Sequence, residues 1–331
     1  MSEVTGAQQA TAEFGAQQQA AGGEPDWLAM PAEELLAFRE AENRRRASPA
    51  AQAITGTPDP GATIEWQDVA LPGRELPVRV YRPSIDRSGA ESGESGLPFV
   101  LHVHGGGFVG TAVQSDWVNS HLAAQLPAVV VSVEHRLVGP DTSLADALDD
   151  GWDVLSHVVQ HADGWGIDPA RAVLFGESCG ALITALAAIR ARAAGLQLRA
   201  QVLVNPAVDM TETMLDYASI TEYATTPTLT IPQLQLFHRL AVPQGTDARG
   251  FSPLYAESLS GLPPALVVLP THDPLADQGR RYAERLQAAG TPARLTEFPG
   301  AMHGFLSMPG MVPQATAARE EITEFLRTVL G

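Results

Sequence analysis

The chain has 331 residues, of which 45% are hydrophobic and 18% charged, so it can bury a large core, with an accessory lobe expected at this length. The formal net charge of −17 argues against nucleic acid and anionic membranes as partners, because like charges repel. The absence of lysine excludes Schiff-base and Ser-Lys chemistry, and the single cysteine, Cys179, excludes an intrachain disulfide.

The N-terminal stretch carries little patterning. Residues 1–25 are rich in Ala, Gln and Gly without apolar periodicity, so we predict a disordered tail there. The stretch also lacks the features of a secretory signal, and no run approaches the roughly 18 apolar residues of a membrane-spanning helix. We therefore expect a cytoplasmic protein. A helix is predicted at 31–46, where Glu33 and Glu34 near the start and Arg44 to Arg46 at the end complement the helix dipole.

From about residue 62 strands and helices alternate. Alternating apolar and polar residues predict half-buried strands at 64–69 and 78–81, and the Ser-, Gly- and Glu-rich stretch 83–97 predicts a surface loop. Continuous apolar runs predict strands covered on both faces of a sheet. They lie at 99–101, 129–131, 172–175, 202–204 and 265–269. Helices are predicted at 143–161, 180–194, 277–289 and 313–330. This alternation predicts an α/β fold with a mostly parallel sheet.

One segment interrupts the alternation. The connection between the strand ending near Val204 and the next strand near Pro264 is too long for a simple loop, and it contains helix-like stretches near 212–222 and 232–241. We predict an inserted helical cap at 207–250, packed with the early helix. The predicted organisation is a tail (1–25), a cap (26–50 and 207–250) and an α/β core (51–206 and 251–331).

The pentapeptide Gly176-Glu177-Ser178-Cys179-Gly180 fits the pattern G-x-S-x-G. It lies between an apolar strand and an apolar helix, the setting of a nucleophile elbow, in which a tight turn with small flanking residues presents the serine above the sheet. We predict that Ser178 is the nucleophile of a serine hydrolase. The alternative is a glycine-rich turn with an incidental serine.

A second glycine-rich turn, His104-Gly105-Gly106-Gly107-Phe108, directly follows the strand at 99–103. Glycines let the backbone approach a ligand closely, and their N–H groups can bind a developing oxyanion. We predict Gly106 and Gly107 as oxyanion donors, with the N–H of Cys179 as the third. His104 is expected to shape the loop, and a flexible turn is the alternative.

Asp273 comes just past the strand at 265–269, at the strand end where catalytic groups of parallel sheets lie. We predict it as the catalytic acid. The alternative role for such an aspartate is a helix N-cap, which Asp277 fits better.

His303 follows a strand near 293–298 and precedes the last helix. The chain order Ser, Asp, His is that of α/β hydrolases, so we predict His303 as the general base. His272 is the rival base, but it adjoins Asp273 and cannot easily face it. Three other histidines are predicted at the surface or at an interface: His135, His157 and His161.

These groups together can hydrolyse an ester. A neutral imidazole accepts the proton of the weakly nucleophilic serine, and a carboxylate fixes the tautomer of the imidazole and stabilises the imidazolium that forms. An acyl-enzyme intermediate results, which water then hydrolyses. Neither a cofactor nor a metal is required.

On these residues, from about residue 60 to its end, the chain resembles the hormone-sensitive-lipase-like esterases, bacterial family IV of the α/β-hydrolase superfamily. The motifs are His104–Phe108, Arg136–Leu137, Gly166–Pro169, Ser252–Leu254, Asp273–Leu275 and His303–Phe305. The resemblance implies a cap built from N-terminal helices plus an insertion, and hydrolysis of short- to medium-chain carboxylic esters. We expect Phe108 to line the substrate pocket.

Two departures from the family pattern bear on the substrate range. The usual GDSAGG is changed by Glu177 and Cys179, and the usual Tyr-Arg-Leu-Ala-Pro-Glu reads His135-Arg136-Leu137-Val138-Gly139-Pro140 here. Two other functions remain open: a lyase or acyl-transfer and cyclisation enzyme of specialised metabolism using the same triad, and a non-catalytic ligand-binding member, against which His303 argues. The expected partner is a small-molecule ester, and the protein is a monomer or a homodimer.

Overall fold

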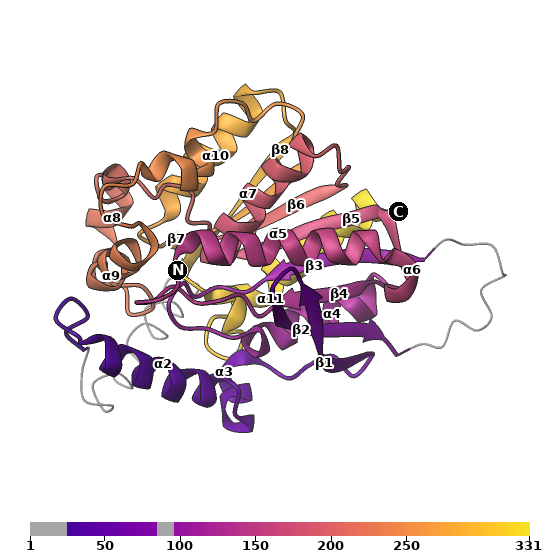
Figure 1. The fold of residues 1–331 in the computed structure, drawn as a ribbon, viewed down its shortest axis with the longest axis horizontal. Helices are drawn as coiled ribbons and strands as arrows, with labels where there is room; N and C mark the ends of the chain where they lie inside the picture. The colour runs from indigo at the N-terminus through magenta and orange to yellow at the C-terminus, as the bar shows by residue number, and fades with distance from the viewer. Residues whose placement is uncertain (1–24, 85–95) are drawn as a thin grey trace.

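The structure is a computed structural model that describes residues 25–84 and 96–331. The tail predicted over 1–25 and the loop predicted over 83–97 therefore fall almost entirely outside the described residues. The described chain forms an eight-stranded sheet in the order β1-β2-β4-β3-β5-β6-β7-β8 (Figure 1). Strands β1 to β4 span Ala62–Leu71, Arg74–Pro83, Leu97–Val103 and Val129–Val133; strands β5 to β8 span Ile167–Glu177, Ala200–Val204, Ala265–His272 and Ala293–Met302.

The sheet is mostly parallel, as predicted. Only β1 with β2 and β2 with β4 pair antiparallel, and every later pairing is parallel. Every predicted strand lies inside an observed one. In β4 all five residues are buried, with Val129 and Val131 in the core on one face and Val130 in the core on the other. This confirms the α/β fold and explains the uninterrupted apolar runs, since a strand covered on both faces has no polar side.

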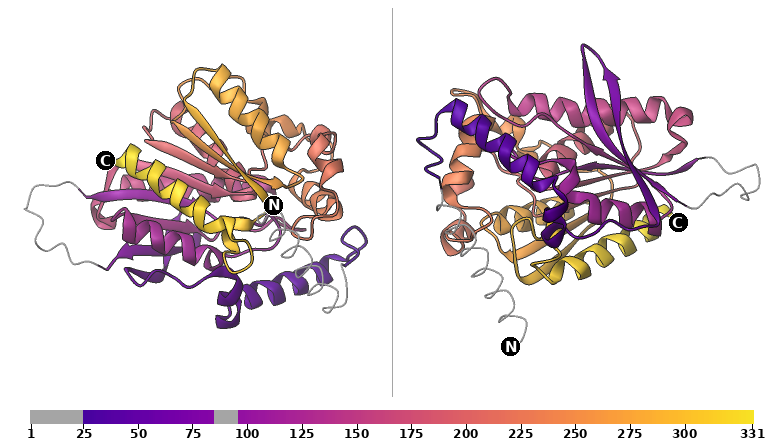
Figure 2. Two further views of the ribbon diagram at one scale, coloured as in Figure 1. Left: turned by 180° about the vertical axis from the view of Figure 1, so that it is seen from behind. Right: turned by 90° about the horizontal axis from the view of Figure 1, so that it is seen from below.

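Helices cover both faces of the sheet. One face packs against α5 (Leu144–Gln160), α7 (Cys179–Ala193) and α10 (Ala276–Ala288). The other packs against α4 (Asp116–Gln125) and α11 (Gln314–Leu330), which crosses the sheet in the left view of Figure 2. The short helix α6 (Ala162–Trp165) leads into β5, and 3₁₀ turns η2 and η6 span Ala112–Ser115 and Phe305–Ser307. The helices predicted from sequence end within one residue of these bounds.

Several short elements gather at one end of the sheet (Figure 1). From the N-terminal region come α2 (Ala32–Arg46), η1 (Pro49–Ala51) and α3 (Gln52–Thr55); from the later segment come η3 (Glu212–Leu215), α8 (Ala218–Glu222), α9 (Ile231–Ala241), η4 (Ala248–Phe251) and η5 (Pro253–Tyr255). Arg239 of α9 donates to the carbonyl of Leu28, 2.9 Å away, so the two segments predicted as a cap are in contact. The helix predicted near 212–222 is broken at Tyr217, which is extended.

The strand order places a crevice above the middle of the sheet. From β3 the chain passes to β4 on one side, and β5 then pairs with β3 on the other. At such a switch point the connections leave in opposite directions, and ligands bind at the carboxyl ends of the strands. The turns after β3 and β5 are the two glycine-rich motifs of the sequence.

Candidate active site

Ser178 lies in the turn between β5 and α7, in a backbone conformation that ordinary residues avoid. Its φ is 53° and its ψ −115°. A Cβ on Gly176 would lie 2.4 Å from the Gly180 carbonyl oxygen, and a Cβ on Gly180 would lie 2.1 Å from the Val103 oxygen. Both glycines are therefore required by close backbone packing, and the turn is pressed against the end of β3.

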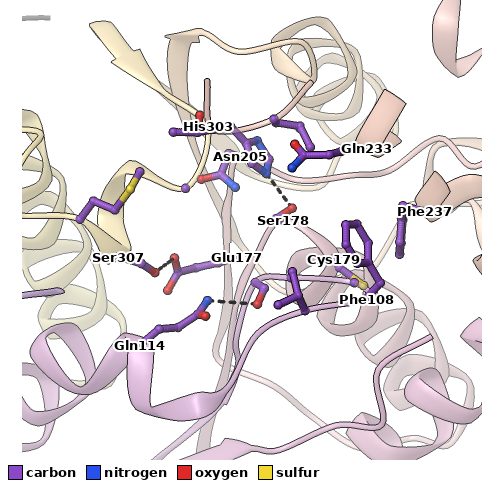
Figure 3. Close-up of a pocket in the computed structure, with 18 of the residues that line it drawn as sticks. Phe108, Gln114, Glu177, Ser178, Cys179, Asn205, Gln233, Phe237, His303 and Ser307 are labelled. Carbon is purple, nitrogen blue, oxygen red and sulfur yellow. Dashed lines mark hydrogen bonds between the residues drawn. The ribbon is translucent and has the colours of Figure 1, made fainter. Parts of the chain in front are cut away.

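A continuous hydrogen-bonded chain joins Asp273, His303 and Ser178, and Figure 3 shows its contact between His303 and Ser178. His303 Nδ1 lies 2.8 Å from Asp273 Oδ2, and His303 Nε2 lies 2.8 Å from Ser178 Oγ. The second oxygen of Asp273 accepts from the Leu275 N–H at 2.8 Å, and the carboxyl group is fully buried. Because an ionised carboxylate only accepts, Nδ1–H must donate to it, which leaves Nε2 free to accept the serine proton. The structure thus brings together the three residues predicted as acid, base and nucleophile.

The rival residues lie elsewhere. Asp277, in the first turn of α10, pairs with Arg280 at 2.8 Å and accepts from the Ser219 N–H. His272 is exposed, and its ring lies 5.2 Å from that of Tyr223. Within the described part of the chain, neither forms a hydrogen bond, an ion pair or a ring contact with Ser178 or His303, so the distinctions drawn from sequence agree with the geometry.

The three predicted oxyanion donors line the same pocket as Ser178. Gly106 has φ +99°, and a Cβ there would lie 1.8 Å from the Val109 carbonyl oxygen. A Cβ on Gly107 would lie 2.0 Å from the Phe237 ring of α9, so that ring packs directly on the loop. Cys179 is the first residue of α7, where backbone N–H groups have no acceptor within the helix.

Two buried histidines pack together at the start of the glycine-rich turn after β3. The rings of His104 and His135 stack at 4.4 Å, and His104 Nδ1 donates to the Gly105 carbonyl at 2.9 Å. Burial lowers the pKa of His104 to about 3 and that of His135 to about 4, so both are neutral at pH 7. The prediction of His135 at the surface or an interface is wrong, because the residue is buried and its ring stacks on that of His104. His157 is half-buried and His161 exposed.

The two unusual elbow residues are both buried. Glu177 accepts from Ser307 Oγ at 2.9 Å and from Ser115 Oγ at 3.2 Å, and His102 Nε2 lies 3.4 Å from it. The longer side chain thus reaches a polar cluster beside the pocket floor. Burial raises the pKa of the Cys179 thiol to about 12, so the thiol stays protonated and a poor nucleophile near neutral pH.

The pocket over Ser178 has a volume of about 240 Å³ and walls from both predicted cap segments and the core. Phe108 lies in it, as predicted. Its other apolar side chains include Met214, Leu229, Leu234, Phe237, Leu275 and Met308. Polar pocket residues not identified from sequence include Gln114, Asn205 and Gln233 (Figure 3).

Asn205 is the most unusual of these residues. It follows β6 with φ 36°, its carboxamide is buried, and neither of its side-chain polar atoms has a hydrogen-bonding partner among the described residues. Its position at the carboxyl end of a central strand is the signal that could have identified it.

Two kinds of feature are absent from residues 25–84 and 96–331. No cluster of three or more His, Cys, Asp or Glu side chains there could hold a metal ion. No helix there is both long enough and apolar enough to cross a membrane.

Comparisons with known proteins agree on one family. A family model described as alpha/beta hydrolase fold matches residues 100–307. The chain is 36% identical over 268 residues to carboxylesterase NlhH of Mycobacterium tuberculosis, covering 78% of this chain and 80% of the relative. It is 31% identical over 302 residues to ethyl acetate hydrolase of Pseudomonas putida, covering 88% and 91%. The solved ester-hydrolase from the metagenome of Lake Arreo, complexed with a bipyridine phosphonate derivative, is 29% identical with a TM-score of 0.83 over 96% of this chain and 98% of that one.

Proposed function

Because the chain belongs to the α/β-hydrolase family, among the esterases related to hormone-sensitive lipase, we propose that Ser178, His303 and Asp273 hydrolyse short- to medium-chain carboxylic esters in this pocket. The protein is a serine hydrolase of the carboxylesterase class. The observation that carries the residue assignment is the hydrogen-bonded chain from Asp273 through His303 to Ser178.

The geometry supports a two-stage reaction. As Ser178 Oγ attacks the ester carbonyl carbon, its proton passes to His303 Nε2, and the carbonyl π electrons move to the oxygen. That oxyanion accepts hydrogen bonds from the loop N–H groups of Gly106 and Gly107 and from Cys179. The imidazolium, stabilised by Asp273, then protonates the departing alkoxide, and the alcohol leaves an acyl-enzyme. Water repeats the sequence and releases the carboxylic acid.

The size of the pocket supports a short acyl group. Its volume of about 240 Å³ is below the roughly 300–1,000 Å³ typical of sites for drug-sized ligands. Phe237 packs on Gly107 and limits the length of the acyl chain from the side of α9. In this proposal residues 26–50 and 207–250 act as the cap that sets chain length. A cytoplasmic location and a monomeric or homodimeric state stay predictions from sequence.

The test is an ester series with acyl chains from two to twelve carbons, assayed with the wild type, Ser178→Ala and the surface control Ser258→Ala. Ser178→Ala should lose at least about 10⁴-fold in kcat on every ester, because triad residues act as a unit. Ser258→Ala should match the wild type, and short chains should be preferred. Mass spectrometry after fluorophosphonate treatment should find the label on Ser178. A labelled residue elsewhere, with full activity in Ser178→Ala, would refute the assignment.

A further inference from the structure

We propose that Arg46 and Gln114 form a hydrogen-bonded relay to the Gly105 carbonyl, and that this relay aims the Gly106 N–H at the oxyanion. Both are then positioning residues for the reaction. The inference rests on the proposed function, because it takes the Gly106 N–H as an oxyanion donor. It extends the catalytic machinery to α2, about sixty residues before the loop in the sequence.

Each residue of the relay donates a hydrogen bond to the next one, from Arg46 to the Gly105 carbonyl. Arg46 Nη1 donates to Gln114 Oε1 at 3.0 Å. Gln114 Nε2 donates to the Gly105 oxygen at 3.1 Å, and Figure 3 shows the Gln114 side chain with this hydrogen bond. His104 Nδ1 donates to the same oxygen at 2.9 Å. The carbonyl of Gly105 therefore has two donors, one for each lone pair, and both come from buried side chains.

The geometry of the peptide unit turns these contacts into an orienting device. The Gly105 carbonyl and the Gly106 N–H belong to one planar peptide group, which is trans because the described chain has no cis peptide bond. In a trans peptide the C=O and N–H point in opposite directions. Holding the oxygen towards Gln114 and His104 therefore directs the N–H the other way. A Cβ on Gly105 would lie 3.6 Å from Ser178 Cβ, so this peptide is beside the nucleophile.

A glycine-rich loop needs such a device. Adjacent glycines can rotate the peptide between them at little steric cost, and a rotated peptide would present its carbonyl to the oxyanion instead of its N–H. Rotation here would break two buried hydrogen bonds, each of which is costly to leave unmade. Hydrogen bonds in a chain also polarise one another, so the Arg46 charge strengthens the relay, although the ion pair with Glu42 at 2.9 Å offsets part of that charge.

Two further contacts show that α2 holds the loop as a unit. Asn43 Oδ1 accepts from the Gly110 N–H at 2.9 Å, and Arg39 Nε donates to the Phe108 carbonyl at 2.6 Å. Arg39, Asn43 and Arg46 are spaced four and three residues apart, so they lie on one face of α2. The polar side chains on this face of α2 therefore form hydrogen bonds with backbone groups of the glycine-rich loop.

The experiment compares Gln114→Met, Gln114→Glu and Arg46→Met with the wild type, and uses Arg44→Met as the matched control. Gln114→Met keeps the length of the side chain and removes the donor, whereas Gln114→Glu keeps the acceptor for Arg46 and removes the donor. Arg44 is on the same helix, is exposed, and forms an ion pair with Glu40. Each protein is assayed for kcat and KM on p-nitrophenyl butyrate.

A pair of inhibitors separates positioning from packing: the trifluoromethyl ketone and the methyl ketone that match the butyryl chain. Ser178 Oγ adds to the trifluoromethyl ketone, its carbonyl opens to an alkoxide in the oxyanion hole, and the proton passes to His303. The methyl ketone binds without this step. Removing an oxyanion donor completely lowers kcat by about 10²–10³-fold, so a donor that points in the wrong direction should lower kcat by about 10- to 100-fold.

We expect kcat and the affinity for the trifluoromethyl ketone to fall together by that factor in both Gln114 variants. In Arg46→Met the fall should be smaller, and Arg46→Lys should recover most of it. KM and methyl-ketone affinity should stay within about twofold, and Arg44→Met should be unchanged.

A raised KM with unchanged kcat in Gln114→Met would make Gln114 a substrate contact and overturn the relay. Unchanged kcat in all three relay variants would overturn it as well. Either result leaves the esterase proposal intact, which fails only if Ser178→Ala stays active. If Gln114→Met does not fold, Gln114→Glu and Arg46→Met, changed at a partly exposed side chain, still decide the question.

Discussion

Two carboxylates lie four residues apart after β7, and their surroundings give them different roles. Asp273 is buried and has one oxygen on His303 and the other on a backbone N–H. Asp277 is partly exposed and accepts from Arg280 and from the start of α8. Burial with a single imidazole partner is the arrangement expected of an acid that fixes a tautomer, whereas Asp277 joins two helices.

Asp273→Asn should therefore lower kcat by about 10⁴-fold while the protein stays folded, because an amide in place of the carboxylate favours the wrong imidazole tautomer. Asp277→Asn is the matched control and should keep nearly all the activity. Steady-state kinetics and circular dichroism on both variants check this. An inactive, folded Asp277→Asn beside an active Asp273→Asn would reverse the two roles.

At single residues, sequence was informative where a motif and a strand end coincide. Ser178, Asp273 and His303 each follow a strand in a known order, so their meeting could be predicted. Gln114 could not, because its role depends on a helix far away in the chain, and Asn205 carried no signal beyond its place directly after β6. His135 was placed wrongly because a polar residue after a strand looks exposed, whereas its burial comes from stacking on His104.

Among the elements, α9 brings the later segment against the loop after β3. Its start was visible in the sequence, since Thr230 and Gln233 form a capping box and Pro232 lies in the first turn. The break at Tyr217 was not visible, because the hydroxyl of that residue donates to buried Asp209 at 2.7 Å, a tertiary contact. Local capping thus fixed the start of α9, whereas tertiary packing broke the helix predicted near 212–222.

Phe237→Ala should shift the acyl preference to longer chains. The ring packs on Gly107, so its removal lengthens the pocket, and kcat/KM for octanoate relative to butyrate should rise about tenfold, or about 1.4 kcal/mol. Leu240→Ala, on the same helix but outside the pocket lining, controls for loss of packing and should leave the ratio unchanged. An unchanged ratio in Phe237→Ala would mean that another wall limits chain length.

For the molecule as a whole, the buried histidine pair links folding to pH. Burial lowers the pKa values of His104 and His135 to about 3 and about 4, below the roughly 6.5 of an unfolded histidine. Between the folded and the unfolded pKa values, the unfolded chain binds more protons than the folded one. The free energy of unfolding therefore falls as the pH drops below about 6.5, and the two histidines cause no such loss above that pH. At pH 5 the loss is about 2 kcal/mol for each histidine.

His135→Phe keeps a ring on His104 and removes one titrating group. Urea unfolding at pH 7.5 and pH 5.0 should show a fall in unfolding free energy that is smaller by about 2 kcal/mol in this variant than in the wild type. His161→Phe, at an exposed position, should retain the wild-type fall. If the unfolding free energy decreases equally in the wild type and in His135→Phe, the buried ring does not cause the loss of stability at acidic pH.

The fold class and the bounds of α5, α7, α10 and α11 followed from the sequence because periodicity and caps are local. The strand order did not, since nothing in the chain before β5 indicates that β5 will pair beside β3 rather than β4. The crevice that holds the site depends on that choice, so the sequence could suggest Phe108 and the two cap segments as walls but not how they meet around Ser178.

Strand β8 is the last strand at one margin of the described sheet, and it leads directly into His303. Marginal strands open more readily than central ones, so a transient detachment of β8 would remove the base from Ser178 while the remaining sheet stays paired. Turnover then depends on a strand that, in the described sheet, has a neighbour on one side only. Warming would produce molecules that are otherwise folded but inactive, and each would regain activity when β8 pairs with β7 again. Activity would therefore be lost at a temperature below the melting temperature of the protein.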